Sequence, residues 1–255
     1  MGKQFKVDRL NVFIHDSREE MGKKGAAVVA EKLRGLLSEK DEVNIIFASS
    51  PSQDDLLGAL AKEPGIEWWR VNAFHMDEYS GLDISAKQSF ANYLKVGFFS
   101  QVGFKDVFYM DGLNDPRYEC ARYSVLLEKY PTDVTLIGIG ENGHIGFNDP
   151  YMADFFDPGL VVINGELDPT CREQQVADGW FETIGDVPKG AVTVSVYGLL
   201  KAPAVFATVP GIRKAGIVKR CLEGAIGIEC PSTGIRLHRD ATLFLDNDSS
   251  SLLTI

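Results

Sequence analysis

The stretch Gly138-Ile-Gly-Glu-Asn-Gly-His-Ile-Gly-Phe-Asn-Asp-Pro150 follows the mostly apolar residues 134–137. An apolar run that ends in glycines predicts a buried strand leading into a tight turn. This turn carries an amide, an imidazole and a carboxylate at Asn142, His144 and Asp149. Glycines let a backbone approach a ligand closely, and an imidazole can move protons near neutral pH. We therefore interpret the turn as part of an active site.

A second polar cluster, Phe74-His-Met-Asp-Glu-Tyr-Ser-Gly-Leu82, also follows an apolar run that is typical of a strand. The carboxyl ends of parallel strands meet at one edge of a sheet. We therefore expect the two clusters to form one site.

Strand and helix patterns alternate along the chain. Ser17 followed by Glu20 is a capping-box pattern that predicts a helix to about residue 38. Further helices are expected at residues 54–62, 87–99, 116–128 and 214–222. Strands are expected at residues 11–14, 43–48, 66–74, 107–110, 134–139, 161–164, 192–196, 205–209 and 242–245. This alternation predicts an α/β fold with a doubly wound, mostly parallel, Rossmann-like sheet flanked by helices.

The domain organisation is expected to be simple. No stretch rich in Pro, Gly or Ser separates two parts, so we predict a single domain over residues 1–255. Residues 150–189 have the least regular pattern and are a candidate lid over the site.

Composition argues against several classes of protein. The net charge is −10 without a block of Lys or Arg, which argues against a nucleic-acid or anionic-membrane partner. No stretch approaches the roughly 18 apolar residues of a membrane span. The four cysteines lack paired spacing and read as reduced thiols of a cytoplasmic protein; they are Cys120, Cys171, Cys221 and Cys230. We expect no metal, and no cofactor, because the turn at 138–143 lacks a dinucleotide fingerprint.

Several motifs together carry a family resemblance. Met76-Asp-Glu-Tyr79 and Gly140-Glu-Asn-Gly-His-Ile-Gly-Phe-Asn-Asp-Pro150 look like the two signature motifs of glucosamine-6-phosphate deaminases (isomerases). The likeness continues through Val187-Pro-Lys189, Ala191-Val-Thr193 and Pro210-Gly-Ile-Arg-Lys214, and it covers roughly residues 40–246. It implies aldose–ketose isomerisation of an (amino)sugar 6-phosphate, with release of ammonia if the substrate is glucosamine 6-phosphate.

The resemblance also implies catalytic roles. Asp77 occupies the place of the general base, and His144 occupies the place of the ring-opening histidine. Asn142 stands where some members have Asp, and Asp149 stands where many have Glu. These four residues are our predicted catalytic set. An amide can orient an imidazole by hydrogen bonding but cannot stabilise its charged form as a carboxylate would.

The phosphate clamp departs most from the family pattern. The family's Thr-Gly-Gly-Thr/Ser turn is replaced by Ser49, Ser50, Pro51 and Ser52, followed by Gln53. Pro51 removes one backbone donor, while the serine hydroxyls add donors beside a helix N-terminus. We expect these serines and Gln53 to contact substrate.

Two cations are predicted to hold the phosphate. Lys214 matches the family's phosphate lysine. The family's phosphate arginine is missing, because its place falls within Asp178-Gly-Trp-Phe181, and Arg172 is predicted to substitute from the lid. Gln174 and Gln175 are further candidates for sugar hydroxyls. Two more residues complete the predicted substrate contacts, Glu78 and Gly143, with bracing of the loop as the alternative for Glu78.

Two other functions fit parts of this pattern. The first is a 6-phosphogluconolactonase, a hydrolase of the same fold, which resembles Asp-Glu-Arg and Gly-His-Thr where this chain has Tyr79 and Ile145. The second is a non-catalytic sugar-phosphate sensor, which would need a DNA-binding helix pair that residues 1–40 do not provide. The expected partner is a small phosphorylated sugar. The sequence leaves a homo-oligomer open.

Overall fold

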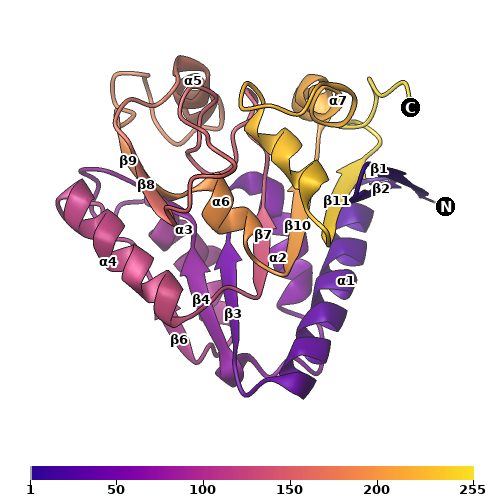
Figure 1. Ribbon diagram of the computed structural model, residues 1–255, viewed down its shortest axis with the longest axis horizontal. Coiled ribbons are helices and arrows are strands. Elements are labelled where there is room, and N and C mark those ends of the chain that lie inside the picture. Colours follow the sequence, from indigo (N-terminus) through magenta and orange to yellow (C-terminus); the bar gives the residue numbers. More distant parts are fainter. Residues whose placement is uncertain (1) are drawn as a thin grey trace.

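The computed structural model describes residues 2–255 and is built around an eight-stranded sheet (Figure 1). Its order is β1-β2-β11-β10-β7-β3-β4-β6, and only β1 runs antiparallel to its neighbour among these strands. The strands are β1 (Lys3–Val7), β2 (Leu10–His15), β3 (Val43–Phe47), β4 (Val71–His75), β6 (Asp106–Phe108), β7 (Val134–Ile137), β10 (Ala204–Val209) and β11 (Ala241–Asp246). The predicted doubly wound, mostly parallel α/β sheet is confirmed. Residue 1 of the predicted domain lies outside the described residues.

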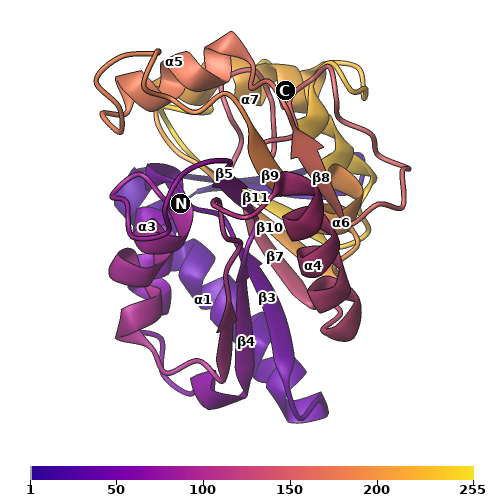
Figure 2. The ribbon, with the colours of Figure 1, turned by 90° about the vertical axis from the view of Figure 1, so that its left-hand side faces the viewer.

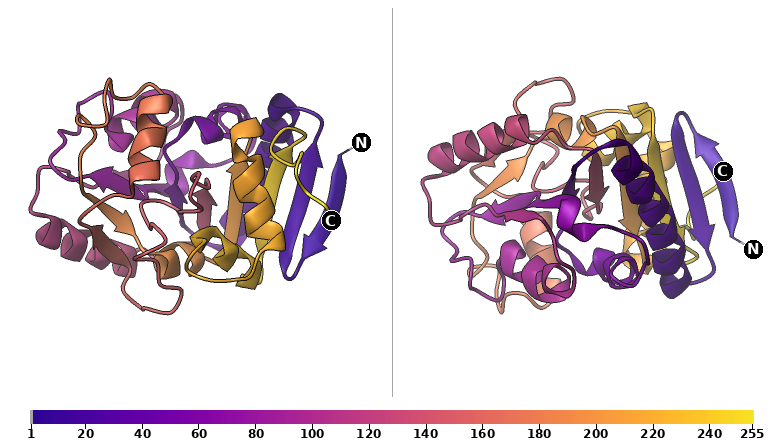
Figure 3. Two further views of the ribbon diagram at one scale, coloured as in Figure 1. Left: turned by 90° about the horizontal axis from the view of Figure 1, so that it is seen from above. Right: turned by 90° about the horizontal axis from the view of Figure 1, so that it is seen from below.

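Helices cover both faces of this sheet (Figure 3). Side chains alternate along a strand, so Ile45 and Phe47 face one apolar core while Ile46 faces the other. The first core is closed by α1 (Arg18–Glu39), α2 (Asp54–Leu60) and α3 (Phe90–Gly97). The second is closed by α4 (Pro116–Lys129), α6 (Val196–Leu200) and α7 (Ala215–Glu223).

Local signals fix where the long helices begin. The Ser17 hydroxyl accepts a hydrogen bond from the backbone N–H of Glu20 at 3.2 Å, so the predicted cap of α1 is present. Asp115 caps α4 in the same way, with Pro116 in the first turn, where a missing N–H is harmless.

A small antiparallel sheet stands beside the carboxyl edge of the main one (Figure 2). It consists of β5 (Asp77–Tyr79), β9 (Ala191–Val194) and β8 (Val161–Asn164), and α4 packs against β8 and β9. Its register sets Asp77 opposite Thr193. The strands expected at 161–164 and 192–196 are present, but they pair in this second sheet.

Other elements differ from the prediction. The strand expected at residues 66–74 begins only at Val71, because Trp68–Arg70 form a 3-10 turn. Residues 150–189 contain β8 and also the helix α5 (Pro169–Ala177), which lies above the sheet edge. Near the N-terminus, the strand expected at residues 11–14 is present as β2, and β1 is an additional strand that was not expected. The turn that connects β1 and β2 contains Asp8 at a φ of 53°. None of the helices in the described part of the chain is long and apolar enough to span a membrane.

The buried imidazole of His75 makes a testable contribution to pH-dependent stability. Its Nε2 accepts a hydrogen bond from the N–H of Met110 at 2.7 Å, and burial lowers the pKa of His75 to about 3. The unfolded chain takes up this proton near pH 6.5, but the folded chain does not. Stability should therefore fall as the pH falls from 6.5 toward 3, by about 1.4 kcal/mol per pH unit from this group.

Replacing His75 with Gln should remove that part of the slope. Urea unfolding of both proteins between pH 4.5 and 6.5 gives the free energy of unfolding at each pH. The contribution of His75 is the difference between the two slopes of this free energy against pH, so a lower absolute stability of the variant does not matter. Identical slopes in the two proteins would contradict the assignment.

Candidate active site

A cavity of about 420 Å³ opens at the carboxyl edge of the main sheet. Loops that follow β3, β7 and β10 form its wall together with β5 and α5. The cavity-lining residues are Arg18, Ala48, Ser49, Ser50, Pro51, Ser52, Met76, Asp77, Phe90, Gly138, Ile139, Gly140, His144, Gly146, Phe147, Gln174, Gln175, Asp178, Pro210, Gly211, Ile212, Arg213, Lys214 and Asp248. Of the predicted site residues, this wall brings together Ser49, Ser50, Ser52, Asp77, His144 and Lys214. Six others lie behind it: Gln53, Glu78, Asn142, Gly143, Asp149 and Arg172.

Asp77 presents a carboxylate without a partner to the cavity. It begins β5, is 5% exposed, and receives no side-chain hydrogen bond from any residue between 2 and 255. Gly146, at a φ of 58°, lies close by: a side chain there would stand 3.4 Å from Asp77 Oδ2 and 2.9 Å from Thr193 Oγ1. Burial and the neighbouring Glu78 raise the pKa of Asp77 well above its usual value. The group is therefore a strong base for a carboxylate.

Glu78 faces the opposite way, because side chains alternate along β5. Its carboxylate accepts hydrogen bonds from Ser89 Oγ at 2.7 Å and from the N–H groups of Ala91 at 3.1 Å and Phe90 at 3.3 Å. It thus satisfies the free N–H groups at the start of α3. The prediction of substrate contact at Glu78 does not fit this geometry, and the alternative, a bracing role, does.

Asn142 holds the imidazole of His144. Asn142 Nδ2 donates to Asp149 Oδ1 at 2.9 Å, which leaves Asn142 Oδ1 facing His144 Nδ1 at 2.7 Å. An amide oxygen only accepts, so Nδ1 carries the proton and Nε2 keeps its lone pair. Burial lowers the pKa of His144 to about 4, so the ring is neutral at pH 7.

Asp149 anchors this arrangement from behind. Its Oδ2 accepts hydrogen bonds from Asn164 Nδ2 at 2.8 Å and from the N–H of Asp168 at 3.0 Å. Its Oδ1 lies 3.6 Å from His144 Nδ1. Asp149 therefore acts on the imidazole electrostatically and supports Asn142, but it does not reach the cavity.

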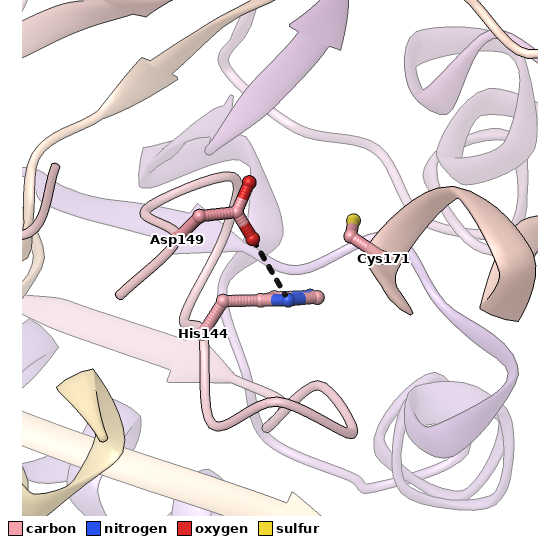
Figure 4. Close-up of side chains that lie close together, drawn as sticks. All are labelled: His144, Asp149 and Cys171. Carbon is pink, nitrogen blue, oxygen red and sulfur yellow. Dashed lines mark ion pairs between the residues drawn. The ribbon is translucent and has the colours of Figure 1, made fainter. Parts of the chain in front are cut away.

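His144, Asp149 and Cys171 are the described residues whose donor atoms could approach a metal ion, within 4.8 Å of one another (Figure 4). The two carboxylate oxygens of Asp149 already accept three hydrogen bonds, and His144 Nδ1 is bonded to Asn142. Burial also raises the pKa of Cys171, which keeps it a thiol rather than a thiolate ligand. Two of the three groups, His144 and Asp149, are thus already engaged in hydrogen bonds.

The loop after β3 offers hydroxyl groups to the cavity. The hydroxyl of Ser49 is buried and without a hydrogen-bond partner in the described chain, while Ser50 Oγ and Ser52 Oγ lie 2.6 Å apart. Gly138 faces this loop, since a side chain there would stand 3.0 Å from Ser52 Oγ. The amide of Gln53 instead donates to the carbonyls of Ile137 and Thr208. Gln53 therefore ties strand ends together, contrary to its predicted contact with substrate.

Two further predictions do not fit the positions of the side chains. The guanidinium of Arg172 donates to the carbonyls of Ile184 at 2.5 Å and Val187 at 2.9 Å, which links α5 to the loop that follows it. Gly143, at a φ of 94°, turns toward Cys230: a side chain there would stand 2.8 Å from its Sγ. Neither residue reaches the cavity.

Lys214 lies in a 3-10 turn, Ile212–Lys214, after β10. Its Nζ is 3.5 Å from Gln174 Oε1, and burial lowers the pKa of Lys214. Four more polar residues line the cavity, and the sequence predicted no role for them: Arg18, Arg213, Asp178 and Asp248. Arg213 could have been found inside the Pro210–Lys214 motif, and Asp178 could have been found because its stretch is where the family's phosphate arginine falls.

A buried base and a neutral imidazole in one cavity at the edge of a doubly wound sheet define an enzyme-like site for proton transfer on a small polar molecule. Residues 16–146 match the family model of glucosamine-6-phosphate isomerases/6-phosphogluconolactonase. The chain belongs to this family.

Relatives of known sequence agree with this assignment. The glucosamine-6-phosphate deaminase of Listeria monocytogenes serovar 1/2a is 32% identical over 233 residues, which is 91% of this chain and 95% of the relative. That of Bacillus cereus (strain B4264) is 31% identical over 246 residues, 95% of this chain and 89% of the relative.

Solved structures share the fold. A monomeric glucosamine-6-phosphate deaminase of the NagB superfamily has a TM-score of 0.84 at 27% identity, covering 95% of this chain and 99% of that one. The 6-phosphogluconolactonase of Thermotoga maritima has a TM-score of 0.76 at 17% identity, covering 93% and 99%. The second likeness shows the fold alone.

Replacing Asn142 with Asp should raise the pKa of His144. A carboxylate beside Nδ1 stabilises the charged ring, and an opposite charge at this range shifts a pKa by about 1–3 units. An NMR titration of the histidine ring measures the shift from the wild-type value of about 4. Asn247→Asp, an exposed change of the same kind, is the control. A value that stays near 4 in the Asn142 variant would show that this position does not set the charge of the ring.

Proposed function

We propose that this chain is an aldose–ketose isomerase of the glucosamine-6-phosphate deaminase type that acts on an amino-sugar 6-phosphate and releases ammonia. The observation that carries the proposal is the unpartnered carboxylate of Asp77 in the same cavity as the neutral imidazole of His144. The names of the relatives at 31–32% identity support it.

In this mechanism His144 opens the sugar ring. With its lone pair on Nε2, the imidazole takes the proton of the anomeric hydroxyl as the bond between C1 and the ring oxygen breaks. It returns a proton to the ring oxygen, and the open-chain aldehyde results. A neutral ring suits this step because it can both accept and donate. Asn142 and Asp149 hold the ring in the tautomer that the step requires.

Asp77 then moves a proton between neighbouring carbons. Removal of the C2 proton, as the substrate's own ammonium group passes a proton to O1, gives an enolamine, and return of the C2 proton to C1 gives a protonated imine at C2. Water hydrolyses the imine to a ketose and ammonia. The raised pKa of Asp77 strengthens it as a base, because the proton it abstracts is bound more tightly.

The phosphate end of the substrate lies between Lys214 and the loop after β3 in this proposal. The unpartnered hydroxyl of Ser49 can donate to a phosphate oxygen, and Ser50 and Ser52 line the same wall. Burial disfavours the charge of Lys214, so an anion that replaces its lost water contacts stabilises the ammonium. The net charge of −10 makes such local cations necessary.

Residues 150–189 serve as the lid of a single domain in this proposal. Their helix α5 contributes Gln174, Gln175 and the adjoining Asp178 to the cavity wall. A lid suits the chemistry, because it keeps water from the enolamine until the proton has returned. A cytoplasmic location fits the four free cysteines. A homo-oligomer is compatible with this assignment.

The test is incubation with a panel of hexosamine 6-phosphates, hexose 6-phosphates and 6-phosphogluconolactone. Ammonia and product masses are followed. Ammonia with a ketose phosphate from a hexosamine phosphate supports the proposal. Turnover of the lactone alone would assign a hydrolase instead, and no turnover at all, with a sugar phosphate bound, would point to a sensor.

Asp77→Asn should lower the rate on the accepted substrate by about 10²-fold or more, because it removes the general base. The matched control is Asp83→Asn, which removes an exposed carboxylate from the same segment and should keep the wild-type rate. Initial rates with both variants decide the point. If the Asp77 variant keeps more than a tenth of the wild-type rate, Asp77 is not the base.

A further inference from the structure

The cavity contains a cation that is already neutralised. Arg213 Nε donates to Glu141 Oε1 at 2.9 Å, and Arg213 Nη1 donates to Asp178 Oδ1 at 2.9 Å. Arg213 and Asp178 both line the cavity, and Arg213 is the neighbour of Lys214 in the chain. The acidic side chain of Asp178 thus pairs with Arg213 and lies close to Lys214, the cation that the proposed function assigns to an anion.

Lys214 is engaged from the same side. Gln174 Oε1 lies 3.5 Å from Lys214 Nζ and accepts a hydrogen bond from the N–H of Glu141 at 3.1 Å. Gln174 Nε2 lies 3.4 Å from the other carboxylate oxygen of Asp178. The end of helix α5 therefore supplies acceptors to both cations.

The charges explain why these contacts can be exchanged. The side chain of Asp178 is 19% exposed and that of Arg213 is 49% exposed, so water screens their attraction. A phosphate dianion carries more charge than a carboxylate, so it can accept the Nη1 arm in place of Asp178 while Glu141 keeps the Nε side of the guanidinium. When phosphate replaces Asp178, the weak ion pair between Arg213 and Asp178 is lost and a stronger ion pair between Arg213 and phosphate forms. Arg172, fastened to two lid carbonyls, is not free to do the same.

We propose that Asp178 is a built-in competitor for the phosphate subsite. It holds Arg213 at the cavity wall in the empty enzyme, and the substrate phosphate displaces it, so that Arg213 joins Lys214 as the second phosphate ligand. The identity of the anion rests on the proposed function. Because Asp178 caps the carboxyl end of α5, the displacement also frees one attachment of the lid.

The test is the affinity for inorganic phosphate, measured by calorimetric titration at fixed ionic strength. Asp178→Asn should bind phosphate about 2- to 5-fold more tightly than the wild type, the amount expected from removing one competing, screened ion pair. The matched control is Glu173→Gln. This residue lies on the same helix, is exposed, and has no ion pair in the described chain, so the loss of one negative charge there should change the affinity less than 2-fold.

A double-mutant comparison distinguishes competition between Asp178 and phosphate for Arg213 from a general effect of removing a negative charge. Arg213→Met should weaken phosphate binding at least about 10-fold, and Asp178→Asn added to it should then have less than a 2-fold effect. A gain in affinity that persists without Arg213, or no gain in the single variant, would overturn the proposal. Asp178→Ser gives the same comparison if the Asn variant fails to fold.

The proposed reaction and this inference can fail separately. Phosphate binding is measured without turnover, so the expected pattern in an enzyme that turns over no sugar phosphate would uphold the competitor role and reject the reaction. Deaminase activity with no coupling between Arg213 and Asp178 in phosphate binding would uphold the reaction and reject the competitor role of Asp178.

Discussion

The buried carboxylate of Asp149 connects the parts from which the cavity is made. Its two oxygens accept three hydrogen bonds. The donors are Asn142 in the loop after β7, Asn164 in β8 and Asp168, the residue before α5. A buried carboxylate without such partners costs several kcal/mol, so the three segments can keep this charge buried only by staying together. The position of the imidazole, the small sheet and the start of α5 all depend on that group.

The carboxylate of Asp77 and the imidazole of His144 are affected by the same physical cause. Burial raises the pKa of Asp77 and lowers the pKa of His144, because it disfavours the charged form of both. The cavity therefore holds a carboxylate that is a stronger base than usual and an imidazole that is less basic than usual. Opposite shifts of two titratable groups in one cavity are typical of sites that transfer protons.

The sequence was most informative where local chemistry decides the structure. Ser17, the alternation of strands and helices, and the turn around His144 predicted the main sheet and the edge at which the cavity lies. It was least informative where distant segments meet. The pairing of β5 with β9 joins residues more than a hundred positions apart through three residue pairs, and no local pattern encodes it. The same holds for Arg172 and Gln53: their residue types suit a substrate, but carbonyls brought near by the fold take their hydrogen bonds.

Asn142 shows how a departure from a family pattern can keep the geometry and change the electrostatics. An amide can donate to Asp149 and accept from His144 at once, so it links two groups whose nearest atoms are 3.6 Å apart. A carboxylate here would face Asp149 with a second negative charge and would favour a protonated ring. The amide instead fixes the proton on Nδ1 while the ring stays neutral. The lone pair on Nε2 is thereby kept at neutral pH, in a cavity that the carboxylate of Asp77 also lines.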